Sequence, residues 1–346
     1  MAKEFAEFKI TDKGKIKMNL TFEQIKSITQ GAVRFAEVDG GLMPCRFTEA
    51  QERAYEGYSA DFYKKTFASA GIRLEMLTDS KSISMEVELT PASSRSYACF
   101  DIYANGALLK NCRCSVNGDR TKATVCSELP ESKKPLEVTV YFPWSASTVI
   151  GSVTLEDGAS VEPIKRPLTM INFGDSITHG YDCTNPSFSY ASRLTDALHA
   201  EAVNKGIGGE IFYPTLASLK DDLDPDIITV AYGTNDWSHS TKVAFDRDAK
   251  EFYEILSKNY PKAKIFAISP LWRHNMDSTE KDVGPFSYVY DYLAKVTADL
   301  PNVTLINGLE LVPHEWRCFP GDGLHPNDEG FRHYANNLYA EIKKYL

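Results

Sequence analysis

The sequence contains no run of lysine and arginine longer than a pair, and no apolar stretch long enough to span a membrane. Surfaces that bind nucleic acid or anionic lipid need clustered positive charge, whereas this chain has a net charge of -9 at pH 7. Charged residues also interrupt residues 1–20, unlike the apolar core of a signal peptide. These absences predict a cytoplasmic protein without a nucleic-acid or membrane partner.

The seven cysteines follow no pattern that indicates disulfides or zinc. Their number is odd and their spacing is irregular, and one residue separates Cys112 from Cys114 where the usual metal-binding pair has two. We therefore expect plain thiols.

The 346 residues are enough for two domains, and the pattern changes near residue 165. Before that point, short segments of alternating or β-branched residues, separated by turns such as 105–106, predict an antiparallel β-sandwich. After it, continuous apolar segments such as 168–174 alternate with helical stretches, which is typical of a doubly wound parallel sheet. We predict a β-sandwich domain with short helices at 1–165 and an α/β domain at 166–346.

Polar residues follow two of the predicted parallel strands. Ser176 comes after the strand at 168–174, and Asn235 and Asp236 come after the strand at 226–233. Ligands of such sheets bind at the carboxyl ends of the strands, where these residues stand. A serine in this position can also be a simple helix N-cap, and the tripeptide Gly-Asp-Ser alone does not separate the two interpretations.

Four blocks in order favour a function for the serine. They are GDSITHG at 174–180, VNKGIGGE at 203–210, YGTNDW at 232–237 and DGLHP at 322–326. Their sequences, order and spacing resemble the SGNH branch of the GDSL hydrolases. The resemblance implies a three-layer hydrolase domain and a serine esterase mechanism that needs no metal or organic cofactor. A jelly-roll-like sandwich in front of such a domain resembles the arrangement in several carbohydrate acetyl esterases.

The resemblance implies a catalytic triad of Ser176, Asp322 and His325. A serine hydroxyl is a weak nucleophile until a base removes its proton, and a third group must orient that base. One turn can present both Asp322 and His325, because they are three residues apart beside glycines. His179 is the nearest rival base in the sequence, but it lies in the turn of the nucleophile itself, so we favour His325.

The implied oxyanion hole consists of the backbone amides of Ser176 and Gly209 and the side-chain amide of Asn235. Attack on an ester carbonyl creates a negative oxygen, which preorganised donors must stabilise. Gly208 remains an alternative to Gly209, because the two glycines are adjacent.

A metal site is the competing interpretation of these polar residues. Asp175, Asp236, Asp322 and His325 are possible ligands of a divalent cation. A metal site needs neither a serine at a strand end nor a pair of amide donors, so we predict serine chemistry without a metal. We expect Asp175 and Asp236 to anchor loops through backbone hydrogen bonds.

Three tryptophans, Trp237, Trp272 and Trp316, lie in predicted loops near the site. Aromatic faces beside polar groups suit sugar rings, although tryptophan is also an ordinary core residue. We predict an esterase that removes short acyl groups, with acetyl as the expected group, from a small-molecule or oligosaccharide ester. The alternatives are a lysophospholipase or thioesterase of the same fold, or an inactive carbohydrate-binding protein.

Overall fold

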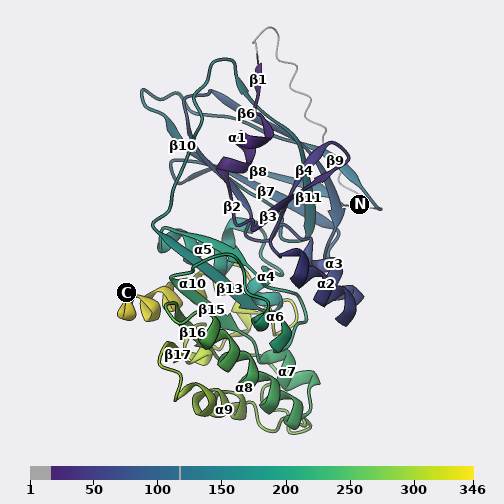
Figure 1. Ribbon diagram of the computed structural model, residues 1–346, viewed down its shortest axis with the longest axis vertical. Helices are drawn as coiled ribbons and strands as arrows, with labels where there is room; N and C mark the ends of the chain where they lie inside the picture. The colour runs from purple at the N-terminus through teal and green to yellow at the C-terminus, as the bar shows by residue number, and fades with distance from the viewer. Residues whose placement is uncertain (1–16, 117) are drawn as a thin grey trace.

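The computed structural model describes residues 17–116 and 118–346, so residues 1–16 of the predicted N-terminal domain and Asn117 lie outside the described part. The described chain contains two antiparallel sheets and one parallel sheet. The antiparallel sheets occupy one half of the molecule, and the parallel sheet with its helices occupies the other (Figure 1). The predicted fold class, a doubly wound parallel sheet preceded by an antiparallel β-rich domain, is confirmed.

The first antiparallel sheet has the strand order β3-β4-β11-β6-β9, with β1 paired to β11. Its strands are β1 (Lys17–Asn19), β3 (Arg34–Val38), β4 (Gly41–Cys45), β6 (Ser82–Pro91), β9 (Thr121–Glu128) and β11 (Ala146–Glu156). The second sheet has the order β12-β5-β10-β7-β8, with β2 paired to β5. Its strands are β2 (Thr29–Gln30), β5 (Arg73–Thr78), β7 (Tyr97–Ala104), β8 (Ala107–Ser115), β10 (Leu136–Tyr141) and β12 (Glu162–Pro163).

Alternation along these strands decides which side chains face the core, because successive residues point to opposite faces of a sheet. In β6, the apolar residues Ile83, Met85, Val87 and Leu89 are buried. They share one hydrophobic core with residues of the second sheet such as Phe100. The two sheets therefore pack face to face as a sandwich.

The parallel sheet has the strand order β14-β13-β15-β16-β17. Its strands are β13 (Leu168–Gly174), β14 (Ala200–Asn204), β15 (Ile227–Ala231), β16 (Lys264–Ile268) and β17 (Val303–Ile306). The α-helices of this half are α4 (Ser176–His179), α5 (Tyr190–Ala197), α6 (Pro214–Ser218), α7 (Thr234–His239), α8 (Lys242–Asn259), α9 (Ser287–Thr297) and α10 (Asp328–Ile342). The short 3-10 helices are η1 (Pro186–Phe188), η2 (Gly308–Glu310), η3 (Trp316–Cys318) and η4 (Lys343–Tyr345).

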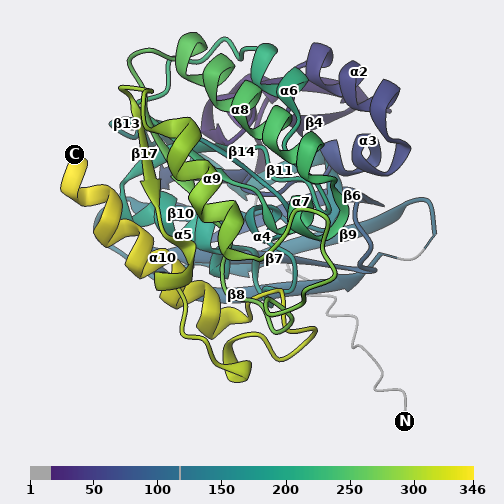
Figure 2. The same cartoon turned by 90° about the horizontal axis from the view of Figure 1, so that it is seen from below.

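Helices cover both faces of the parallel sheet, which makes three layers (Figure 2). Met170 and Ile268 pack in a core with α5 and α10, whereas Ile171, Phe173 and Val230 pack in a second core with α6, α8 and α9. Both faces of the sheet are thus buried, which explains why the sequences of its strands are continuously apolar. The predicted domain boundary at 165 and 166 stays a prediction.

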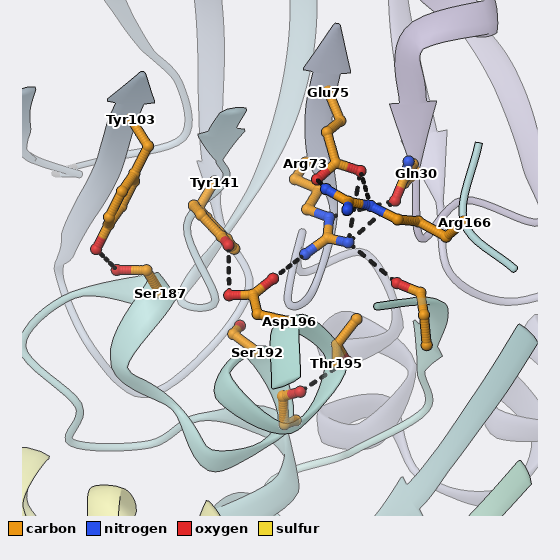
Figure 3. Close-up of polar contacts among 12 residues, drawn as sticks. Gln30, Arg73, Glu75, Tyr103, Tyr141, Arg166, Ser187, Ser192, Thr195 and Asp196 are labelled. Carbon is orange, nitrogen blue, oxygen red and sulfur yellow. Dashed lines mark hydrogen bonds and ion pairs between the residues drawn. The ribbon is translucent and has the colours of Figure 1, made fainter. Parts of the chain in front are cut away.

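Polar contacts join the second sandwich sheet to α5 and η1 (Figure 3). Arg73 on β5 binds Asp196 on α5, with 2.6 Å between Nη1 and Oδ1. The Tyr141 hydroxyl donates to the other oxygen of Asp196 at 2.7 Å, and the hydroxyls of Tyr103 and Ser187 lie 3.0 Å apart. The two halves therefore meet through directed contacts between side chains and do not rely on apolar packing alone.

Three helices interrupt the strands of the N-terminal half: α1 (Phe22–Ile28), α2 (Glu49–Tyr58) and α3 (Ala60–Thr66). Thr48 caps α2 and Ser59 caps α3, each accepting a hydrogen bond from a backbone N–H of the first turn. Residues 46–66, which we call the helical arm, lie beside the parallel-sheet half near α6 (Figure 2). Among the described residues, no helix combines the length and the apolar character needed to cross a bilayer.

Candidate active site

Ser176 is the first residue of α4 and follows β13 after a single residue. The Asp175 side chain caps α4 by accepting the Ile177 N–H at 2.9 Å. Gly174 is needed at the strand end, because a Cβ there would lie 2.1 Å from the Thr178 hydroxyl oxygen. This tight turn from strand to helix sets Ser176 at the carboxyl end of the parallel sheet.

Ser176, His325 and Asp322 form a continuous chain of hydrogen bonds. The Ser176 Oγ lies 2.7 Å from His325 Nε2, and His325 Nδ1 lies 2.6 Å from Asp322 Oδ2. The other oxygen of Asp322 accepts the backbone N–H groups of Leu324 and His325, each at 2.9 Å. The structure therefore brings the three predicted triad residues together, although Ser176 begins α4 and the other two lie in a loop about 150 positions later.

The surroundings of Asp322 favour its ionised form. Partial burial raises the pKa of this carboxyl group, but hydrogen bonds from the side chain and backbone of His325 outweigh burial and hold the pKa well below its usual value. An ionised Asp322 can only accept at His325 Nδ1, so this nitrogen carries the proton. The free lone pair of Nε2 then faces the Ser176 hydroxyl, which is the tautomer a general base requires.

The loop after β14 carries both candidate glycine donors. The Gly208 N–H donates to His179 Nδ1 at 3.2 Å and is therefore already used. Gly209 is exposed and has a φ of +89°, which a glycine adopts without strain, and its N–H has no hydrogen-bond partner among the described residues. Asn235, in the first turn of α7, faces this loop and donates from Nδ2 to the Glu210 carbonyl oxygen at 3.0 Å.

The helical arm holds this glycine loop from the N-terminal half. The buried Arg46 side chain donates from Nη1 to the carbonyl oxygens of Asn204 at 2.6 Å and Gly206 at 3.1 Å. Lys65 Nζ donates to the Gly208 carbonyl oxygen at 2.8 Å. Burial lowers the pKa of Arg46 to about 9, and the hydrogen bonds to carbonyl oxygens satisfy its charge in place of water.

Glu210, at the end of the glycine loop, is a buried carboxyl group between two tyrosines. The hydroxyls of Tyr55 in the helical arm and Tyr232 after β15 both bond to its carboxyl oxygens, the second at 2.8 Å. Burial raises the pKa of Glu210 to about 8. The side chain thus ties α2 to the loop whose carbonyl group positions Asn235.

His179, the rival base, does not contact Ser176 Oγ. Its ring is buried, with Nε2 2.8 Å from the Trp144 carbonyl oxygen and Nδ1 accepting the Gly208 N–H. Burial and the charge of Arg46 lower its pKa well below the usual value. Both ring nitrogens are therefore used to join the nucleophile turn to the sandwich and to the glycine loop.

The four ligands of the competing metal site do not come together. Asp175 and Asp236 are buried, and Asp236 Oδ1 accepts the Phe212 N–H at 3.0 Å. Burial raises the pKa of Asp175 to about 6 and that of Asp236 to about 7. A different trio, Asp182, Asp322 and His325, offers possible ligand atoms within 4.8 Å of one another in the described chain. Both nitrogens of His325 are already hydrogen-bonded, Nδ1 to Asp322 and Nε2 to Ser176.

Trp237 is a core residue, which corrects the expectation that its ring faces a substrate. The side chain is fully buried, its indole N–H donates to the Gly284 carbonyl oxygen at 2.9 Å, and its ring packs edge-on against Phe286. A residue two positions after Asn235 on a helix points away from the side of Asn235, so its sequence proximity to the site is misleading.

The other two tryptophans lie near the loop that carries Asp322 and His325. Trp272 is half-buried and stacks on His314, with ring centroids 6.1 Å apart. Trp316 is 50% exposed, and its ring lies 3.0 Å from the position that a Cβ on Gly323 would take. The His274 ring packs edge-on against Trp316 with centroids 4.7 Å apart, so part of the Trp316 ring is exposed beside the loop that carries Asp322 and His325.

A serine, a histidine and an aspartate meet at the carboxyl edge of a doubly wound sheet, with a glycine loop and an asparagine beside them, as the resemblance of the four sequence blocks to SGNH hydrolases implies. Residues 173–333 match the GDSL-like Lipase/Acylhydrolase family, so the family predicted from the four sequence blocks is confirmed for this segment. No curated protein sequence gives a significant match to the chain.

Several solved structures share the fold of both halves. A salicylyl-acyltransferase, SsfX3, from a tetracycline biosynthetic pathway is 22% identical and has a TM-score of 0.77, covering 92% of this chain and 94% of its own. A putative GDSL-like lipase from Bacteroides ovatus is 16% identical, with a TM-score of 0.72 and coverages of 95% and 97%. A family two carbohydrate esterase from Clostridium thermocellum, solved with cellohexaose, is 18% identical, with a TM-score of 0.63 and coverages of 91% and 98%.

Proposed function

We propose that the protein is a serine esterase that removes short acyl groups, with acetyl as the preferred group, from a carbohydrate. The observation that carries the proposal is the hydrogen-bond chain from Ser176 Oγ through His325 to Asp322. Such a chain activates a serine hydroxyl, because the histidine can accept its proton while the aspartate stabilises the resulting imidazolium.

In the first half of the proposed cycle, Ser176 Oγ attacks the acyl carbonyl carbon while its proton moves to His325 Nε2. The carbonyl oxygen becomes negative and is met by the N–H groups of Ser176 and Gly209 and by the Asn235 amide, which has a second hydrogen free for it. The carbon–oxygen bond to the alcohol then breaks, and the alcohol leaves with the proton from His325. The acyl group stays on Ser176 as an ester.

In the second half, water attacks this acyl-enzyme and gives a proton to His325. Collapse of the tetrahedral intermediate releases the carboxylic acid and returns the proton to Ser176. Transfer to another alcohol differs only in the group that replaces water at this step. Because one of the structural neighbours is named an acyltransferase, hydrolysis and transfer should be measured together.

The exposed Trp316 beside the base loop supports a carbohydrate as the alcohol. Aromatic side chains offer a flat apolar face to the C–H groups of a sugar ring, and neighbouring polar groups bind the hydroxyls. The structural neighbours named carbohydrate esterases are consistent with this choice, since they share both halves of the fold.

The test is a panel of p-nitrophenyl esters from acetyl to octanoyl together with acetylated oligosaccharides, measured with wild type and Ser176→Ala. We expect Ser176→Ala to remain folded and to lose ester hydrolysis, because the change removes one hydroxyl at the edge of the sheet. Acetyl esters should react faster than octanoyl esters. A preference for octanoyl or thioester substrates would favour a lysophospholipase or thioesterase instead, and oligosaccharide binding without turnover would favour a binding protein.

A further inference from the structure

His325 faces a second carboxylate besides Asp322. Asp182 Oδ2 lies 3.8 Å from His325 Nδ1, the nitrogen that already donates to Asp322. This distance is too long for a hydrogen bond, but it is short enough for a strong electrostatic attraction once the ring is protonated.

Asp182 is fixed in place by the sandwich. Arg95, in the loop between β6 and β7, binds it with Nε 3.0 Å from Oδ1, and with Nη2 2.8 Å from Oδ1 and 2.9 Å from Oδ2. Asp182 itself has a φ of +66°, a left-handed conformation that aspartate tolerates better than most residues. The backbone and the partner from the other half of the chain thus both hold this carboxylate beside the base.

Tyr181 separates Arg95 from His325. Its ring stacks on the His325 ring with centroids 5.9 Å apart and an angle of 26°, and the Arg95 guanidinium lies 5.4 Å from the centroid of the same ring. Trp144 from the sandwich packs against Tyr181 at 4.9 Å. Arg95 thus contacts both Asp182 and the ring that stacks on His325.

We infer that Asp182, held by Arg95 of the N-terminal half, is a positioning residue that stabilises the protonated form of His325 during acyl transfer. The inference rests on the serine mechanism proposed above. It gives the sandwich a direct part in catalysis, because removing Arg95 changes the charge that His325 experiences. The effect of Asp182 is smaller than that of Asp322, since Arg95 compensates part of its charge and no hydrogen bond joins it to the ring.

The two members of the pair should shift the pH dependence of the reaction in opposite directions. Asp182→Asn removes a negative charge near the imidazolium, so the rising limb of kcat against pH should move to lower pH by about half a unit and kcat should fall about threefold. Arg95→Met leaves the negative charge of Asp182 uncompensated, so the limb should move to higher pH. Arg95→Lys restores the charge and should return the limb toward its wild-type position.

The remaining charged groups near the triad stay constant in this comparison. The charge of Asp175, next to Ser176, interacts with His325, and that of Arg273, beside α7, interacts with Asp322; neither residue is changed. Arg120→Met is the matched control, because Arg120 pairs with Asp39 and Glu88 within the first sandwich sheet. Its profile should coincide with that of wild type.

A merely structural role for the pair would lower kcat in both variants without opposite shifts, and shifts of the same sign or no shift would overturn the inference. The titration of the His325 ring, followed by NMR and assigned with His325→Gln, gives the same comparison without any substrate. If Ser176→Ala abolishes hydrolysis but the two variants titrate like wild type, the inference fails and the esterase proposal stands. If wild type hydrolyses no ester, the esterase proposal fails, and the NMR titration still decides the effect of Asp182.

Discussion

The two histidines nearest to the nucleophile have opposite surroundings. His325 has a partly accessible ring with an ionised carboxylate on one nitrogen and the serine hydroxyl on the other. His179 is enclosed, and backbone groups occupy both of its nitrogens. Burial thus makes one imidazole a structural crosslink, while partial exposure leaves the other free to exchange protons.

These surroundings predict different consequences for the two His→Gln variants. His325→Gln should lose nearly all esterase activity and keep its thermal stability. His179→Gln should unfold more easily, because it leaves buried polar groups without partners, and should keep the pH dependence of the remaining activity. Asp322 should stay ionised throughout these assays, because its hydrogen bonds to His325 and Leu324 depress its pKa. Steady-state rates and thermal melts distinguish these outcomes, and the reverse ranking would identify His179 as the base.

Trp316 is the single residue on which the choice of alcohol can be tested. Trp316→Ala should raise KM for acetylated oligosaccharides severalfold, because a stacking surface worth about 1 kcal/mol is lost, and should leave p-nitrophenyl acetate hydrolysis nearly unchanged. Tyr290→Ala, which removes another exposed aromatic ring on α9, is the control. Equal losses on both substrates would mean that Trp316 shapes the Asp322 loop and does not bind sugar.

At the scale of elements, the helical arm fixes the glycine loop through side chains that the sequence did not single out. Lys65 reaches the Gly208 carbonyl oxygen, and its neighbour Lys64 is exposed. A donor that is not held in place loses much of its value for an oxyanion, because the arrangement must exist before charge develops.

We therefore expect Lys65→Met to lower kcat about tenfold with little change in KM, since the loop carrying Gly209 becomes less ordered. Lys64→Met, one residue away on the same helix, should behave like wild type. Rates on p-nitrophenyl acetate give the comparison. A change confined to KM would place the effect of Lys65 on substrate binding instead.

The elements differ in how far the sequence could predict them. The parallel strands and the sandwich were predictable because burial on two faces or one face leaves a continuous or alternating apolar pattern. The triad was predictable because its members stand in blocks whose sequences, order and spacing resemble a known hydrolase family. The support from Arg46, Lys65 and Arg95 was not, because no motif marks these residues and their partners lie more than 80 positions away in the chain. The interpretation of Trp237 was wrong because this residue lies on α7, where its ring points away from the side of Asn235 and into the core.

At the scale of the whole molecule, the two halves depend on each other. The sandwich contributes Arg73 and Tyr141 to contacts with Asp196 on α5 (Figure 3). It also contributes the Trp144 carbonyl group to His179. Without the N-terminal half, the carbonyl groups that Arg46 binds lose their partner and the cores of the hydrolase half become exposed at the interface.

A fragment of residues 166–346 should therefore be inactive, and its heat capacity should show no cooperative unfolding transition. Differential scanning calorimetry and p-nitrophenyl acetate assays on the fragment and the full chain provide the measurement. A fragment with wild-type kcat and a sharp transition would show that the halves fold and work separately.

The hydrogen bond from Lys65 to Gly208 joins residues that are 143 positions apart in the chain, so the ribosome adds one long before the other. The helical arm leaves the ribosome before the glycine loop is synthesised, so its hydrogen bonds to that loop cannot yet form. Contacts between residues far apart in sequence form late, because closing a long loop costs entropy that only later contacts repay. Refolding protein should thus regain its secondary structure before its esterase activity. A nascent chain should remain inactive until its last loop, which carries His325, has docked.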